Sequence, residues 1–246
     1  MQEALSQLHP VHYLPIGTTV LSAIFFSVLI GRYFTRRSGP HLLWWAAGIF
    51  AYGLGTGLES AITLAGNSIF LNKSWYIAGA LLGGYPLAQG TVYLLMSRRT
   101  ANLLSAITVP FIVIVSVLVA IAPVKLEALE THRPGGAILG WQWLRLMTPL
   151  INTYAACFLI GGAALSAWRY AKHHTNPNRA VGNALIAFGA LLPGIGGGMA
   201  KAGYVEALYV GEFVGLLFIW AGYVACVRQP KALQELTVEP ALAASS

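Results

Sequence analysis

Two glutamates, Glu59 and Glu212, lie inside long apolar stretches of the chain, where acidic side chains are unusual. A charge in hydrocarbon costs at least ~2.5–3.5 kcal/mol on insertion scales, so a segment that keeps one faces a partner or water. A carboxyl group in such a place can hold a proton, pair with a basic side chain or bind a cationic ligand. These two residues are therefore the main candidates for chemistry in this protein.

The composition places these glutamates in a membrane protein. Hydrophobic residues make up 57% of the chain and charged residues 9%, whereas soluble domains carry ~25% charged residues. The net charge of +7 comes from short basic clusters between apolar runs, which is how membrane proteins fix their orientation. We therefore expect the lipid bilayer as a partner, and no nucleic acid.

Seven apolar runs have about the ~20 residues that a transmembrane helix needs. They lie at about 14–34, 42–64, 75–96, 103–122, 143–167, 180–200 and 204–227. The fourth run is rich in Ile and Val and is expected to face lipid. The sequence thus predicts an all-α polytopic membrane protein, a seven-transmembrane-helix bundle, with residues 1–228 as one domain and 229–246 as a short disordered tail.

The distribution of Lys and Arg predicts the orientation of this bundle. One side of the seven runs carries Arg32, Arg36, Arg37, Arg98, Arg99, Arg169, Lys172, Arg179, Arg228 and Lys231, and the other carries Lys73, Lys125, Arg133, Arg145 and Lys201. The positive-inside bias places the richer side in the cytoplasm. We therefore expect a bacterial-type cell inner membrane, with the N-terminus outside and the C-terminus cytoplasmic.

This topology puts both glutamates in the outer leaflet. At the helical rise, Glu212 lies ~12 Å and Glu59 ~8 Å below the outer boundary. Around Glu59, the residues Tyr52, Thr56 and Thr63 follow a spacing of four, three and four, which forms one polar stripe on an apolar helix. Because Glu59 and Glu212 lie at similar depths, with Arg145 and Lys201 near the same side, the sequence predicts a pocket that opens outward and in which acidic and basic groups compensate each other.

Polar residues of other runs are expected to complete this pocket. Arg145 and Asn152 face the same level from the fifth run, and Lys201 lies near the same side. Pro86 is expected to kink the third run and free a carbonyl group, which Gln89 could satisfy. The candidate ligand-binding residues are Glu59, Glu212, Arg145, Asn152, Tyr209, Gln89 and Lys201.

Glycine contributes two further expectations. In the third run, Gly79, Gly83 and Gly90 lie on a stripe of small residues, which lets a neighbouring helix approach closely. The stretch Gly194–Gly203 is expected to break the sixth run and line the pocket with unwound backbone. The second, third, fifth and seventh runs, with this break, would then form the pocket.

Several familiar chemistries are disfavoured. The chain contains no Asp, which a Ser-His-Asp triad requires, and all its His residues lie in loops or at helix ends, away from the positions of haem ligands. Cys157 and Cys226 lack metal-type spacing. The layout resembles that of microbial rhodopsins, but residues 204–227 contain no Lys for a retinal Schiff base. No catalytic residue, metal site or particular cofactor is indicated.

Two classes of function remain open. The first is a small-ligand or ion binding module, transport-like or receptor-like, that uses Glu59 and Glu212 as counter-ions or proton acceptors. The second is a non-catalytic subunit of a larger membrane complex, packed against partner helices, lipid, quinone or pigment. Either a homo-oligomer or other membrane subunits would fit the glycine-rich faces.

Overall fold

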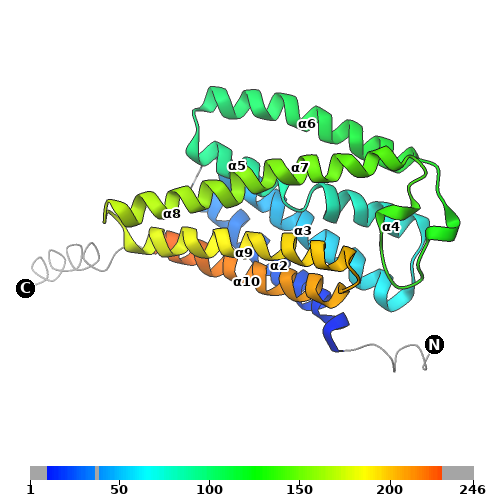
Figure 1. The fold of residues 1–246 in the computed structure, drawn as a ribbon. Helices are drawn as coiled ribbons and strands as arrows, with labels where there is room; N and C mark the ends of the chain where they lie inside the picture. Colours follow the sequence, from blue (N-terminus) through cyan, green and yellow to red (C-terminus); the bar gives the residue numbers. More distant parts are fainter. Residues whose placement is uncertain (1–9, 37–38, 229–246) are drawn as a thin grey trace, which may run out of the picture.

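The computed structural model describes residues 10–36 and 39–228, which are helical except for loops and one bridge between Val124 and Leu139 (Figure 1). The long helices are α2 (Leu14–Arg36), α3 (Pro40–Ala65), α6 (Arg98–Ile121), α9 (Pro177–Lys201) and α10 (Val205–Val227). One composite segment consists of α4 (Ile69–Trp75), the π-helical η2 (Tyr76–Leu81) and α5 (Tyr85–Leu95). The other consists of η5 (Gln142–Leu146), α7 (Met147–Ala155), the π-helical η6 (Ala156–Gly161) and α8 (Gly162–Lys172). Short 3-10 turns are η1 (Pro10–Tyr13), η3 (Leu126–Ala128) and η4 (Gly136–Ile138).

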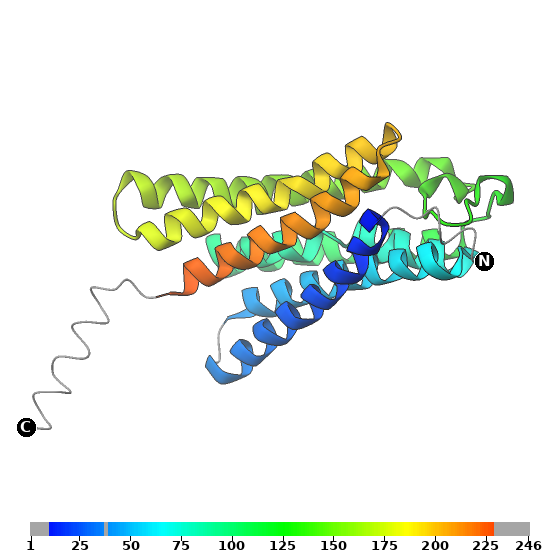
Figure 2. The same ribbon diagram turned by 90° about the horizontal axis from the view of Figure 1, so that it is seen from below.

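The segments run back and forth between two ends of an elongated bundle (Figures 1 and 2). The end of α2, the α5–α6 turn, the α8–α9 turn and the end of α10 lie at one end, on the left of Figure 1. The α3–α4 turn, the α6–α7 loop and the α9–α10 turn lie at the other end. The described members of the larger basic group therefore gather at a single end of the bundle. The predicted tail, 229–246, lies outside the described residues.

Five segments are long and apolar enough to cross a membrane. They are Pro10–Thr35, Arg98–Ile121, Gln142–Lys172, Pro177–Ala200 and Val205–Val227. The other two predicted runs differ from these in composition and continuity. α3 carries Glu59 and a stripe of polar residues, and the α4–η2–α5 segment is interrupted between Leu81 and Tyr85. By length and composition, five helices rather than seven meet the requirement.

The third run has a different course from the one expected. It begins at Ile69, where Ser68 caps α4 by accepting a hydrogen bond from the Leu71 N–H at 3.2 Å. The chain then leaves the helical path at residues 82–84, so that Pro86 stands in the first turn of α5 and does not kink a continuous helix. Proline fits there because the first N–H groups of a helix have no acceptor within it.

The predicted break at Gly194–Gly203 was wrong. α9 stays helical through this stretch as far as Lys201, and the turn to α10 follows at Gly203, whose φ is +103°. Close packing on α10 accounts for the regular helix, because a Cβ at Gly196 would lie 2.6 Å from the Ala207 carbonyl oxygen. The absence of side chains at the contact allows the two backbones to meet.

The same close approach recurs along the whole α9–α10 pair. A Cβ at Gly182 would lie 2.6 Å from the Gly222 carbonyl oxygen, and one at Gly189 would lie 2.5 Å from that of Gly215. On the third run, the expected small-residue stripe does meet a neighbour in part, since Gly79 lies against Gly55 of α3. Glycine therefore sets the spacing of the helices on both sides of the bundle.

The helix α6 lies along the edge of the bundle (Figure 1). Its apolar window has the highest mean hydropathy of the five, 2.7, and only 17% of it is buried, against 33% for α10. Large apolar side chains such as Ile107, Ile114 and Ile121 are exposed. This distribution is the one that a lipid-facing helix requires.

Candidate functional site

Three helices, α2, α3 and α10, bring polar side chains together along one line inside the bundle, here called the polar seam. The polar seam consists of Thr19 and Ser22 of α2, Tyr52, Thr56, Glu59 and Thr63 of α3, and Tyr209 and Glu212 of α10. The stripe predicted on α3 is therefore turned inward: Thr56, Glu59 and Thr63 are 3%, 2% and 1% exposed. The helical spacing of four, three and four produces this alignment.

The centre of the polar seam is a direct contact between two carboxyl groups. The carboxyl groups of Glu59 on α3 and Glu212 on α10 are neighbours, close enough for a proton to be shared between them. In each of them the Oε2 atom is buried and receives no hydrogen bond from a protein donor. Two ionised carboxylates in contact repel each other, whereas one proton held between them would turn the contact into a hydrogen bond. The contact is therefore one that a shared proton would stabilise.

Neighbouring hydroxyl groups fix the backbones on either side of the pair. The Tyr52 hydroxyl donates to the backbone carbonyl oxygen of Glu212 at 3.0 Å, which links α3 to α10. Thr56 Oγ1 lies 2.9 Å from Thr19 Oγ1, which links α3 to α2. A Cβ at Gly53 would lie 2.7 Å from Ser22 Cβ, so the glycine allows α2 to pack closely at this level. The three helices are thus tied together around the pair.

The polar seam is covered at the end that holds the α6–α7 loop. Tyr209 is 2% exposed, and its ring makes a T-shaped contact with the ring of His12 of η1 at 5.9 Å between centroids. His132 Nδ1 lies 3.1 Å from the Thr63 carbonyl oxygen. Arg133 donates to the Ala200 carbonyl oxygen at 2.8 Å and acts electrostatically on Tyr209. The loop therefore closes over the carboxyl pair from this end.

The other predicted ligand residues have different surroundings. Arg145 is exposed in η5 and donates to Gln142 Oε1 at 3.0 Å, and Asn152 is exposed on α7. Gln89 is fully buried, but it lies between α5, α6 and α7, where it donates to Ser105 Oγ at 2.7 Å and accepts from the Tyr154 hydroxyl. The Lys201 side chain lies outside the described part of the chain. Of the seven predicted residues, the structure brings together Glu59, Glu212 and Tyr209.

The helices that contribute side chains to the polar seam also differ from those predicted from the sequence. The third and fifth runs were expected to line it, but α2 takes their place. The signal on α2 was present in Thr18, Thr19 and Ser22, which put hydroxyl groups one turn apart on an otherwise apolar helix. The sequence shows Arg133 only as a charge in a loop, because the fold of the α6–α7 loop over the bundle has no local signature.

The described residues contain no group of three or more His, Cys or Glu side chains arranged to hold a metal ion. The carboxyl pair consists of two acceptor groups under a cover that carries the Arg133 guanidinium group. The pair can store a proton or release it, and either change alters the charge inside the polar seam.

The fold defines a class of protein, the helical multi-pass membrane protein, with five helices long and apolar enough to cross a bilayer. No protein-family model matches the chain, and no curated protein matches it.

Proposed function

We propose that this protein is an ion-binding module of the cell inner membrane, transport-like or receptor-like, in which the Glu59–Glu212 pair takes up and releases one proton. The observation that carries this proposal is the contact between the two carboxyl groups, each with a buried Oε2 atom that no protein donor satisfies. A proton between the groups satisfies both acceptors at once, and its release leaves a negative charge inside the bundle.

The small space around the two carboxyl groups, and their ability to accept a proton, decide which class of ligand the pair can bind. Glu59 is 2% exposed, and its carboxyl group is in contact with that of Glu212, so a small molecule would have to separate α3 from α10 to enter. A proton needs no such separation. Charge in a membrane interior costs several kcal/mol unless it is paired or hydrated. Release of the proton leaves a negative charge at the pair, which favours the entry of water or the approach of a cation. Either event changes the packing of the helices, so the protonation of the pair is coupled to the helix arrangement.

Topology supports access from one side. We propose that α3 and the α4–η2–α5 segment cross the membrane together with the five apolar helices, which gives seven crossings with the N-terminus outside and the C-terminus cytoplasmic. The basic residues at the end of α2, in the α5–α6 turn and in the α8–α9 turn support this orientation by the positive-inside bias. The pair then exchanges its proton with the outer side, through the region that Tyr209 and Arg133 cover.

Infrared spectroscopy tests the proposal, because a protonated carboxyl group has a C=O band that is separate from the bands of carboxylates. We expect the wild-type protein in lipid nanodiscs at neutral pH to show a buried protonated carboxyl band that weakens as the pH is raised and recovers when it is lowered. The double variant Glu59→Gln/Glu212→Gln should lack this band. Its two amides can hydrogen-bond each other, so that the contact between α3 and α10 is kept.

A matched control removes two exposed glutamates instead. Glu130→Gln/Glu206→Gln changes the net charge by the same amount at side chains outside the polar seam, and it should keep the band. A band that survives in Glu59→Gln/Glu212→Gln would contradict the assignment to the pair. A band that stays constant at every pH at which the protein remains folded would show a purely structural acid pair and would overturn the proposed exchange.

The exposed helix α6 favours a second candidate function, a non-catalytic subunit of a larger membrane complex. Its buried share of 17% is low for the most apolar helix of the bundle, and the exposed apolar face could pack against a partner helix, a quinone or a pigment as well as lipid. Purification in mild detergent separates the two candidates. A homogeneous homo-oligomer or monomer favours the ion-binding module, whereas co-purifying subunits favour the complex.

A further inference from the structure

Two apolar hollows flank the last turns of α10, at the end of the bundle away from the carboxyl pair. The first is a groove of about 440 Å³ between α2 and α10, lined by Val28, Arg32, Thr35, Tyr223, Val224, Val227 and Arg228. The second is a hollow of about 430 Å³ along α10, lined by Leu217, Trp220, Ala221, Val224, Ala225 and Arg228. Val224 and Arg228 border both hollows. Figure 2 shows the ends of α2 and α10 apart from each other at this end of the bundle.

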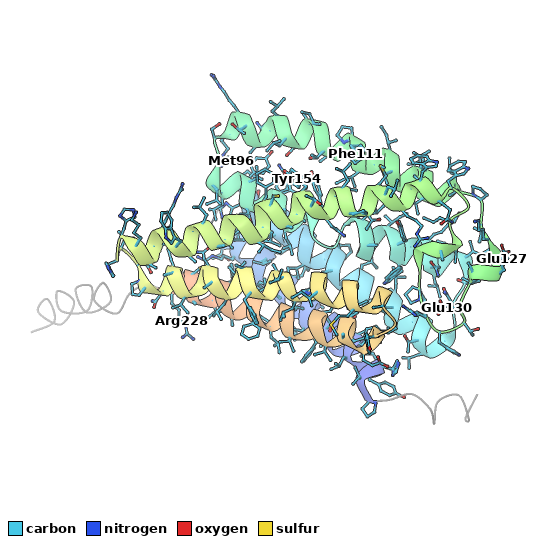
Figure 3. The ribbon with its side chains drawn as sticks, in the orientation of Figure 1. Met96, Phe111, Glu127, Glu130, Tyr154 and Arg228 are labelled. Carbon is cyan, nitrogen blue, oxygen red and sulfur yellow. The ribbon has the colours of Figure 1, made fainter. Side chains whose placement is uncertain are left out.

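The walls of the hollows are apolar, but their rim is basic. Arg32 lies on the α2 side of the groove, with its guanidinium carbon 5.9 Å from the centroid of the Tyr223 ring. Arg228 is exposed at the end of α10 and is directed away from the bundle (Figure 3). Thr35 donates its hydroxyl proton to the Gly31 carbonyl oxygen at 2.7 Å, so its hydroxyl oxygen remains available as an acceptor. Two arginines, Arg32 and Arg228, therefore border a groove whose other walls are mostly hydrocarbon.

Acidic side chains of the described residues lie elsewhere. Glu127 and Glu130 are at the opposite end of the bundle (Figure 3), Glu206 is in the first turn of α10, and Glu59 and Glu212 form the carboxyl pair of the polar seam. The rim of the groove is thus positive without a carboxylate beside it in the part of the chain that the structure describes. An anion from outside the protein is the complement of this rim.

We propose that this double hollow binds one anionic phospholipid of the membrane leaflet at this end, with its phosphate between Arg32 and Arg228. One acyl chain lies in the groove along Val28 and Val227, and the other lies along Leu217 and Ala221, with Val224 between them. Basic pockets at the membrane surface between helices select anionic headgroups in this way, and guanidinium groups bind phosphate oxygens through paired N–H donors. The size and lining of the hollows supply the hydrocarbon contact.

The melting temperature in detergent tests this site when phosphatidylglycerol is titrated in and compared with phosphatidylcholine. We expect phosphatidylglycerol to stabilise the wild-type protein more than phosphatidylcholine does. In Arg32→Gln/Arg228→Gln the apparent affinity for phosphatidylglycerol should fall by about 30-fold, the effect expected of two arginines near an anionic headgroup. The control Arg99→Gln/Arg169→Gln removes two exposed arginines at the same end, outside the hollows, and should retain the wild-type affinity.

A third variant tests the hydrocarbon part of the site with both arginines intact. Val224→Trp places a large ring in both hollows, and it should also abolish the preference for phosphatidylglycerol. Equal stabilisation of the wild-type protein by the two lipids would overturn the proposal. So would an equal loss of affinity in the control variant, which would indicate a general charge effect, or equal stabilisation by inorganic phosphate, which would indicate an anion site without lipid specificity.

Discussion

The substitution Gly189→Ala tests the packing that holds α9 against α10. The added Cβ would lie 2.5 Å from the Gly215 carbonyl oxygen, 2.8 Å from Phe218 Cβ and 2.9 Å from the Ile219 nitrogen. Non-bonded carbon contacts are favourable at ~3.5–4.0 Å. Two of these three atoms belong to the backbone of α10, so rotation of a side chain cannot relieve the contact, and the two helices must separate by about 1 Å.

The cost of that separation can be bounded from general magnitudes. Overpacking a well-packed contact costs about 1–3 kcal/mol, and the better helix propensity of Ala offsets about 0.5–1 kcal/mol of it. The net loss of stability is therefore about 0–2.5 kcal/mol, with a central value of about 1.25 kcal/mol. At roughly 2–4 °C for each kcal/mol in a chain of this size, this central value lowers the melting temperature by about 2.5–5 °C.

The same helix offers a matched control. A Cβ at Gly194 would meet no atom within 4 Å, so Gly194→Ala should leave the melting temperature unchanged or raise it slightly through helix propensity. Both variants are melted in the same detergent and followed by tryptophan fluorescence. Equal melting temperatures for Gly189→Ala and Gly194→Ala would refute the view that backbone contact at Gly189 sets the distance between α9 and α10.

Two further predictions concern the opposite ends of the bundle. In a background without the native cysteines, Ser68→Cys should react with an impermeant thiol reagent in intact cells and Thr175→Cys only after the membrane is opened; the reverse labelling pattern would invert the proposed orientation. The Lys73 ammonium group donates to the Ala120 and Ala122 carbonyl oxygens at 2.9 and 2.7 Å, so Lys73→Met should lower stability by about 1 kcal/mol by leaving these acceptors at the end of α6 without a donor. An unchanged thermal melt of Lys73→Met would mean that solvent replaces the lysine at no cost.

The sequence by itself determined the class of protein and the side chains that α3 turns inward. Hydropathy and the spacing of polar residues are local properties, readable without knowledge of the neighbouring helices. The spacing of Tyr52, Thr56, Glu59 and Thr63 predicted one face, and that face is buried against α2 and α10. The match in depth between Glu59 and Glu212 likewise needed only the helical rise and the alternation of basic ends.

Tertiary structure decided which helices meet at that face. The α9–α10 pair is held by Gly182, Gly189 and Gly196, whose contacts depend on the backbone of another helix. For the same reason Gly194–Gly203 was misread as a break: a glycine-rich helix is weak in isolation, and the packing that keeps it helical is absent from a one-dimensional pattern. Arg133 reaches the site only because the α6–α7 loop folds over the bundle. Local sequence sets the direction in which each side chain points, whereas the partner at that position is chosen by the packing of the whole chain.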